Sequence, residues 1–389
     1  MKGTQLRMRI AACVLAVCLV GSLLTGCGQN GGQSADSSSG AGSGQEAPVP
    51  ETKPQPVNTT GKQALEQDRK LNVAVLQMPI METKDSLPYL DEAVGLLMNN
   101  SLRPELVVGV EYGLGFSPQR LDGEFIEYLS AIAKKYQIYF IPGTFPELSD
   151  ELPEGETFNT CPIFGPDGQL ICAYRKKAPF YPGELSTPSN QEEYCLFEIP
   201  EKGIKVGVMI CYEQFFPEVV RTLALEGAEL LVCPAYDTAE FDYIPEVIPR
   251  CRALENEAFY VYTNGVGSLP GDPFGHSIVV DPRGQVLYRA DSSEMSFTTC
   301  LDFAQVTEKR LYGVDQHLNA LRYFDLPNPY AGRVDEAPVY KDWPELTVTT
   351  DDFDQRVAEI GENTMPRYPD AGMQAEQSQK MEKLIEKIA

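Results

Sequence analysis

Residues 206–213 read Val206-Gly207-Val208-Met209-Ile210-Cys211-Tyr212-Glu213, an apolar run that ends in a thiol and a carboxylate. A short and almost wholly apolar run is typical of a strand that is buried on both faces of a sheet. Phe216 and Pro217 follow, and they predict the start of a helix. Cys211 therefore stands at an expected strand-to-helix turn, where helical N–H groups favour the thiolate form of a cysteine.

Short apolar runs and helical periods alternate on both sides of this stretch. Buried strands are expected at residues 71–78, 106–110, 138–141, 204–210, 230–233 and 259–264. Helices are expected around 90–97, from Ser117-Pro118 to 132, and over 245–256. Hairpins are expected at 158–174 and 277–289, about a Gly-Pro-Asp-Gly and an Asp-Pro-Arg-Gly turn. The alternation predicts one α/β domain of about 250 residues, assigned to residues 71–327.

The N-terminus has the pattern of a secretory signal, with three basic residues ahead of an apolar run at 10–24. That run is about 15 residues long, whereas a membrane-spanning helix needs roughly 20. It leads into Leu24-Thr25-Gly26-Cys27, which resembles the lipobox of bacterial lipoproteins. The resemblance implies a signal peptide at 1–26, a lipid on the Cys27 thiol, and a protein anchored at the extracytoplasmic face of the cell membrane. The alternatives are an ordinary cleaved signal with a chance cysteine, and an uncleaved anchor helix.

Both flanks of the domain have compositions that differ from it. Residues 27–70 are rich in Gly and Ser and then in Pro, with no apolar period that could form a core. A coil of this length reaches on the order of 35 Å, which suits a tether between a lipid and a domain. Residues 328–389 form an acidic, irregular extension whose last part, 374–388, has the period of an amphipathic helix.

The chain is strongly acidic, with a formal net charge of −24. This charge argues against nucleic acid as a partner and against a domain that lies flat on an anionic bilayer. Seven cysteines remain after the signal and Cys27 are set aside, namely 161, 172, 195, 211, 233, 251 and 300. Seven is an odd number and no CxxC pair occurs, so neither a zinc ribbon nor a complete disulfide framework is expected.

Histidine is scarce, because the chain contains only His276 and His317. A Ser–His–Asp or Cys–His site would have to use one of them. Neither has metal-ligand spacing to another His or Cys, and the HExxH motif is absent. Both are interpreted as structural or surface residues, and no metal site is expected.

Reactive side chains follow the expected strands instead. Glu111 ends the strand at 106–110 and Cys211 ends the strand at 204–210, and functional groups gather at the carboxyl ends of strands in α/β sheets. A third segment lies between them, with Tyr174-Arg175-Lys176 and, eight residues past the lysine, Glu184 in a Gly-Glu pair. Taken singly, neither residue indicates a site, because a glutamate at the end of a strand is usually just exposed to solvent and a lone cysteine usually belongs to the core.

Taken together and in this order, the segments closely resemble the nitrilase, or carbon–nitrogen hydrolase, superfamily. The match extends from about Leu71 to Ala290 and includes further motifs: Phe158-Asn159-Thr160, Arg252-Ala253-Leu254-Glu255-Asn256 and Gly275-His276-Ser277. The resemblance implies a four-layer α-β-β-α sandwich that commonly forms homodimers through helices. It also implies a catalytic set that uses neither a metal nor a cofactor.

The resemblance assigns a role to each of these residues. Glu111 would be the general base, and Cys211 would attack a carbonyl to form a thioester. Lys176 and the backbone N–H of Tyr212 would stabilise the oxyanion. Glu184 would position the substrate amine or pass a proton. Tyr112, Tyr236 and Asp237 follow strand ends and are candidates for the substrate pocket.

The expected substrate is a small amide or a carbamoyl-amine. After Lys176 the chain reads Lys177-Ala178-Pro179-Phe180-Tyr181, which differs from the commonest family sequence at this point. The segment resembles the amidase and acyltransferase branches of the family, which argues against a nitrile as the substrate. Two alternatives stay open: an N-acyltransferase-like transfer, and a lipoprotein that binds a ligand without turning it over.

Overall fold

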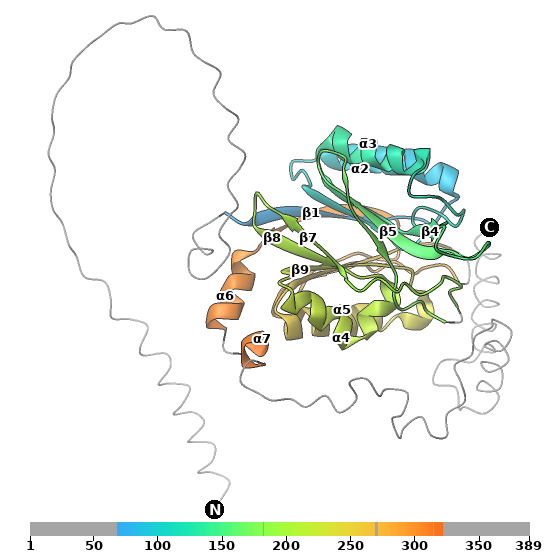
Figure 1. Ribbon diagram of the computed structural model, residues 1–389. Coiled ribbons are helices and arrows are strands. Elements are labelled where there is room, and N and C mark those ends of the chain that lie inside the picture. Colours follow the sequence, from blue (N-terminus) through green and yellow to red (C-terminus); the bar gives the residue numbers. More distant parts are fainter. Residues whose placement is uncertain (1–67, 182, 269–270, 314, 322–389) are drawn as a thin grey trace, which may run out of the picture. The chain divides into compact units, whose positions relative to one another are not determined.

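Two mixed β-sheets lie face to face, and a layer of helices covers the outer face of each (Figure 1). The computed structural model describes residues 68–181, 183–268, 271–313 and 315–321. Within them the α-β-β-α sandwich expected from the family resemblance is confirmed. The expected signal peptide, Cys27, most of the linker and the acidic extension with its amphipathic helix lie outside the described residues. The domain boundaries at 71 and 327 stay a prediction.

The first sheet has strand order β13-β1-β2-β3-β5-β4, with β6 paired to β5. Its strands are β1 (Lys70–Gln77), β2 (Leu106–Val110), β3 (Tyr139–Gly143), β4 (Phe145–Glu147), β5 (Phe158–Phe164), β6 (Leu170–Arg175) and β13 (Met295–Asp302). β1, β2 and β3 are parallel to one another. The helices α2 (Thr83–Met98) and α3 (Glu124–Tyr136) cover its outer face (Figure 1).

The second sheet has strand order β12-β11-β10-β9-β8-β7. Its strands are β7 (Cys195–Ile199), β8 (Ile204–Val208), β9 (Leu230–Ala235), β10 (Phe259–Asn264), β11 (Ile278–Val280) and β12 (Val286–Arg289). β8, β9 and β10 are parallel. The helices α4 (Pro217–Leu225) and α5 (Ile244–Asn256) cover its outer face (Figure 1), and α6 (Ala304–Tyr312) and α7 (His317–Ala320) follow β13.

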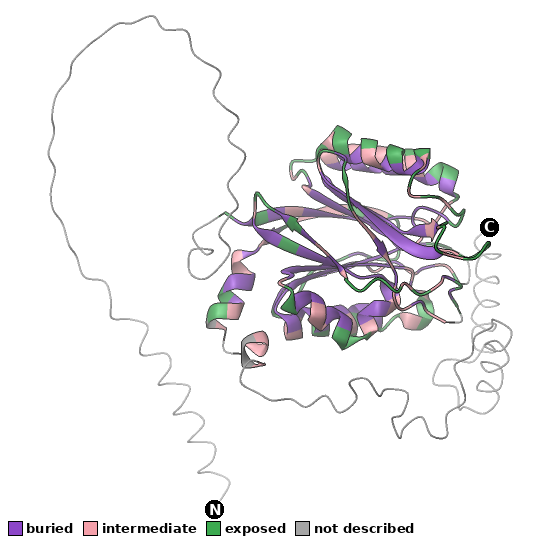
Figure 2. Cartoon of the chain, in the orientation of Figure 1, coloured by how far each residue is buried: buried purple, intermediate pink, exposed green. Residues whose placement is uncertain are grey.

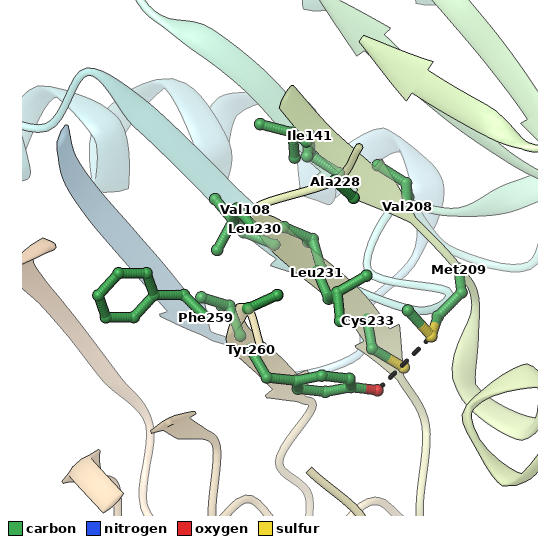
Figure 3. Close-up of a cluster of buried hydrophobic side chains, with 14 of the residues drawn as sticks. Val108, Ile141, Val208, Met209, Ala228, Leu230, Leu231, Cys233, Phe259 and Tyr260 are labelled. Carbon is green, nitrogen blue, oxygen red and sulfur yellow. Dashed lines mark hydrogen bonds between the residues drawn. The ribbon is translucent and has the colours of Figure 1, made fainter. Parts of the chain in front are cut away.

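The central strands are buried on both faces, which explains their almost continuous apolar sequences. Along β1, Val73 and Val75 pack between the two sheets, whereas Ala74 and Leu76 pack under the helices of the first sheet. Buried residues run along the strands and the inner helix faces (Figure 2). In the core between the sheets, Val108 of β2 lies near Leu230 of β9 (Figure 3).

Several features differ from the sequence-based expectations, which included none of β4, β7 and α6. The helix expected to open at Ser117-Pro118 begins only at Glu124, because the backbone of Gln119 pairs with Glu147 in a parallel bridge. The strand β13 was not expected, and it pairs antiparallel with β1 along its whole length. Most β13 residues are partly or fully exposed, so this edge strand lacks the apolar pattern that marks the central ones. No helix among the described residues is long and apolar enough to cross a bilayer.

Arg69 ties three parts of the sandwich together immediately before β1. Its fully buried guanidinium forms an ion pair with Glu229, next to β9. It also donates to the carbonyl oxygen of Gly203 at 3.0 Å, in the β7–β8 turn, and to Thr307 Oγ1 of α6 at 3.0 Å. These contacts hold the first strand of one sheet against the turn between two strands of the other.

Replacing Arg69 with methionine would leave the Glu229 carboxylate buried without its partner. We expect Arg69→Met to lower the free energy of unfolding by about 3–5 kcal/mol, measured by urea denaturation of the full chain. The double variant Arg69→Met, Glu229→Gln removes the unpaired charge and should recover part of the loss. Equal stability of Arg69→Met and the wild type would contradict this account of the ion pair.

Candidate active site

The carboxyl ends of β2 and β8 open into one cavity of about 740 Å³. Glu111 follows β2 directly, and Cys211 follows β8 after two further residues. Lys176, which follows β6, and Glu184, from the next loop, line the same cavity. The structure therefore brings together the four residues that the sequence singled out from separate segments. All four are buried, with at most 8% of the surface of any one of them exposed.

The backbone at Cys211 is strained. Its φ is 46°, in the left-handed region that non-glycine residues rarely adopt, and strain of this kind gathers at functional sites. Cys211 begins a short 3-10 helix, η2 (Cys211–Phe215). Glu213 of that helix accepts a hydrogen bond from the backbone N–H of Ile210 at 2.8 Å. This bond closes the turn and fixes the position of the thiol.

The buried ammonium of Lys176 contacts two carboxylates. Its Nζ lies 2.7 Å from Glu111 Oε1 and 2.6 Å from Glu184 Oε2. Burial by itself would lower the pKa of Lys176, but the neighbouring charges of Glu111, Cys211 and Glu184 raise it well above its usual value. Lysine therefore stays charged. An ammonium has three N–H donors, so one remains beyond these two contacts.

Glu184 is held by five donors. Besides Lys176, its oxygens accept hydrogen bonds from Asn159 Nδ2 at 2.8 Å, Ser186 Oγ at 2.6 Å and Tyr112 OH at 3.2 Å. The backbone N–H of Phe180 supplies the fifth at 2.9 Å. Burial opposes ionisation of Glu184, but Lys176 and these donors lower its pKa below the usual value. Because its oxygens already accept five hydrogen bonds, Glu184 is better suited to position Lys176 than to bind the amine of a substrate.

Glu111 is poised as a base. Burial raises its pKa to about 7, against the opposing effect of Lys176 and with a further increase from Glu184. Asn159 Nδ2 also donates to Glu111 Oε1 at 2.8 Å, so one amide group binds both glutamates and fixes their relative positions. A carboxylate whose pKa lies near neutrality can both take and return a proton.

The Cys211 thiol does not match the expectation of a stabilised thiolate. Burial raises the pKa of this thiol well above its usual value, and the carboxylates of Asp237 and Glu111 raise it further. Lys176 and the backbone N–H of Tyr236 act in the opposite direction but do not outweigh them. The turn at Cys211 therefore does not by itself activate the thiol, because the thiol is buried beside carboxylates. A neighbouring base is needed to remove the proton.

Asp237 makes a contact that the sequence did not predict. Cys211 Sγ lies 3.5 Å from Asp237 Oδ1, and Tyr262 OH donates to Asp237 Oδ2 at 2.8 Å. The sequence placed Asp237 only in the pocket lining, as a residue that follows a strand end. Tyr112, Tyr236 and Asp237 all line the cavity. The strand-end signal found the position of Asp237 but could not reveal its contact with the thiol.

Glu213, the carboxylate that closes the apolar run at 206–213, links the cysteine turn to the lysine segment, a role that was not predicted from the sequence. Its fully buried carboxylate accepts hydrogen bonds from Tyr174 OH at 2.8 Å and from the backbone N–H of Lys177 at 2.7 Å. Lys177 follows Lys176 directly. Glu213 therefore fixes the distance between the thiol and the ammonium.

The remaining candidates are placed as follows. Tyr212 lines the cavity, and its backbone N–H as an oxyanion donor stays a prediction. His276 contacts the ring of Phe274 and His317 lies beside Glu257, and neither residue lines the cavity. Among the described residues no group of His, Cys, Asp and Glu has the arrangement of a metal site.

Known proteins are similar to this chain in both sequence and fold. A family model described as carbon–nitrogen hydrolase matches residues 72–310, which is more than half of the chain. The chain belongs to the carbon–nitrogen hydrolase family. The ω-amidase NIT2 of Mus musculus is 33% identical over 213 residues, which cover 51% of this chain and 75% of that protein. The ω-amidase NIT2 of Danio rerio is 31% identical over 260 residues, which cover 62% of this chain and 91% of that protein.

Solved structures support the same fold. Nit3 of Saccharomyces cerevisiae, a member of the nitrilase superfamily, superimposes with a TM-score of 0.57 at 26% identity, over 64% of this chain and 96% of that one. An amidase from Nesterenkonia sp. superimposes with a TM-score of 0.54 at 22% identity, over 65% of this chain and 97% of that one. At this level of identity the similarity supports the fold alone. Family membership and the ω-amidase relatives make this carbon–nitrogen hydrolase an enzyme of the amidase type, as the sequence predicted.

The raised pKa of Glu111 predicts the pH dependence of this carbon–nitrogen hydrolase. Below about pH 7 Glu111 is protonated and cannot accept the thiol proton, so kcat/KM should fall as the pH drops through that value. The measurement is a pH profile of ammonia release by the full chain. Glu111→Gln should lower kcat/KM by about a hundred- to ten-thousandfold and remove the acid limb. A flat profile across neutral pH would contradict the assignment of Glu111.

Proposed function

We propose that the chain hydrolyses a non-peptide carbon–nitrogen bond of a small amide or carbamoyl-amine through a thioester on Cys211. One observation carries the proposal. The base Glu111, the cation Lys176 and the thiol Cys211 line one cavity, and hydrogen bonds fix all three. A site that only held a ligand would not require a buried base, a buried cation and a thiol at a strained turn.

The first half of the reaction forms the thioester. Glu111 takes the proton of the Cys211 thiol, and sulfur attacks the carbonyl carbon of the amide. The carbonyl oxygen becomes an oxyanion, which the third N–H of Lys176 and the backbone N–H of Tyr212 stabilise. When the carbon–nitrogen bond breaks, Glu111 returns the proton to the leaving nitrogen. Ammonia or an amine departs, and the acyl group stays on sulfur.

The second half releases the acid. Glu111, again a carboxylate, takes a proton from a water molecule, whose oxygen attacks the thioester carbon. Lys176 stabilises the second oxyanion from the same position. The carbon–sulfur bond then breaks, and the thiolate recovers its proton from Glu111. Glu184, Asn159 and Glu213 keep the reacting groups in place throughout, because their hydrogen bonds do not involve the substrate.

Ammonia release by the full chain tests the hydrolase directly. We expect the wild type to release ammonia from at least one primary amide, and Cys211→Ala to lose at least about a thousandfold of that rate, because no other group replaces the nucleophile. Cys251→Ala is the matched control, since Cys251 is an exposed free cysteine, and it should retain wild-type activity. Undiminished turnover in Cys211→Ala would contradict the mechanism. Retention of a bound amide without any turnover would favour the ligand-binding alternative.

We further propose that the enzyme is anchored by a lipid on Cys27 and works outside the cytoplasm. Support comes from the sequence alone: a short apolar run after basic residues, the Leu24-Thr25-Gly26-Cys27 segment, and a Gly-, Ser- and Pro-rich stretch before the domain. In this arrangement the tether would let the domain reach substrates at a distance from the membrane surface.

Expression of the full chain in a bacterium with radiolabelled palmitate tests the anchor. Wild-type protein should incorporate label and sediment with membranes. Cys27→Ser should lose the label, because no thiol remains to accept the lipid. Cys18→Ser, which changes a cysteine of the expected signal peptide, is the matched control and should be labelled like the wild type. Equal labelling of Cys27→Ser and the wild type would contradict the proposed anchor.

A further inference from the structure

We infer that the cavity selects amides with an uncharged, apolar acyl body and rejects amides whose acyl body carries a carboxylate. This inference rests on the proposed amide hydrolysis and names the class of its substrate. It comes from the charges and ring contacts of the residues that line the cavity.

The inner end of the cavity carries more negative than positive groups. Among the described lining residues the acidic ones are Glu111, Glu184 and Asp237, and Lys176 is the sole basic one. The Lys176 ammonium already contacts Glu111 and Glu184. A carboxylate at the far end of the acyl body would therefore find no free cation among these lining residues, and the net negative charge of the lining would disfavour it.

Much of the remaining lining is aromatic. In one cluster Tyr112 stacks on Phe116 with ring centroids 4.9 Å apart, and Tyr236 contacts both rings at 6.4 and 6.2 Å. In a second cluster Phe180 contacts Tyr212 at 5.2 Å and Phe241 at 5.8 Å. These rings offer apolar surface to a substrate body without adding any charge.

Two apolar side chains of the lining are largely exposed. Leu185 is 75% exposed and Phe116 is 55% exposed, although both border the cavity. Exposed apolar side chains that border a cavity are typical of a ligand-binding surface. A substrate with an apolar body would cover them, and a substrate that ends in a charged group would not.

The cavity is also larger than the reacting group requires. Its volume of about 740 Å³ lies within the range of pockets that enclose whole small molecules. The amide group itself fills only the part near Cys211 and Lys176. The rest of the space lies against the aromatic walls, so the acyl body extends toward Phe116 and Leu185.

A cationic body is less well suited than an uncharged one. It would be attracted by the acidic inner end and by the ring faces. However, Glu184 already accepts five hydrogen bonds, and Asp237 contacts Cys211 and Tyr262, so neither carboxylate is free to pair with it. The expected order of kcat/KM is therefore uncharged first, cationic second and anionic last.

Three amides of similar length test this order with the full chain. One is the monoamide of glutaric acid, which carries a terminal carboxylate. The second is its uncharged isostere, in which an isopropyl group replaces the carboxylate, and the third ends in a guanidinium group. We expect kcat/KM for the isostere to exceed that for the anion by at least about a hundredfold, with the cation between them.

A charge placed at the rim should change this preference. Leu185→Arg adds a cation where the end of the substrate lies, so the ratio of kcat/KM for the anion to that for the isostere should rise about tenfold. Leu96→Arg is the matched control. It adds the same charge at an exposed leucine of α2 that does not line the cavity, and it should leave the ratio at the wild-type value.

The outcomes separate this inference from the proposed function. If the wild type hydrolyses the anion as well as the isostere, the substrate class is wrong while amide hydrolysis stands. An equal change of the ratio in both leucine variants would also overturn the inference, because it would assign the preference to the charge of the whole protein. If none of the three is hydrolysed while another primary amide is, the inferred substrate class is wrong; if no amide or carbamoyl-amine releases ammonia, the proposed hydrolysis itself is contradicted.

Discussion

The buried ammonium of Lys176 between Glu111 and Glu184 is the interaction on which the site depends. Removing three charges from water is costly, and such a group is stable only when its members are paired and hydrogen-bonded. Asn159 bridges the two glutamates, and Glu184 accepts five donors. Glu111 follows β2, Lys176 follows β6, and Glu184 lies in the next loop. The sandwich must therefore assemble before the charges can be buried together.

This network determines how protons move in the site. Lys176 keeps its proton, whereas the pKa of Glu111 rises to about 7 because burial outweighs the neighbouring ammonium. The Cys211 thiol keeps its proton as well, since it is buried beside carboxylates. The thiol thus loses its proton only to an adjacent base, and a glutamate takes the part that histidine has in a Cys–His site. The scarcity of histidine in the chain agrees with this arrangement.

Much of the fold and of the site could be predicted from the sequence. The central strands are buried on both faces, so their apolar runs were visible, and Glu111 and Cys211 were found because they follow such runs. The edge strand β13 and the late start of α3 were missed, because each depends on backbone pairing with a distant segment. The contact between Asp237 and the thiol, the five donors of Glu184 and the link through Glu213 join residues far apart in the sequence. No local sequence pattern predicts these contacts. The net charge of the cavity could not be predicted either, because its lining residues come from many separate segments.

The central claim is that Cys211 carries the acyl group during turnover. The most direct measurement is acid quenching of the full chain while it hydrolyses the isopropyl-ended amide, followed by peptide mass spectrometry. The account predicts a mass increase equal to the acyl group on the peptide that contains Cys211, and its loss after treatment with hydroxylamine, which cleaves thioesters. Turnover that leaves Cys211 unmodified, or the same adduct on another cysteine in the Cys211→Ala variant, would contradict the account.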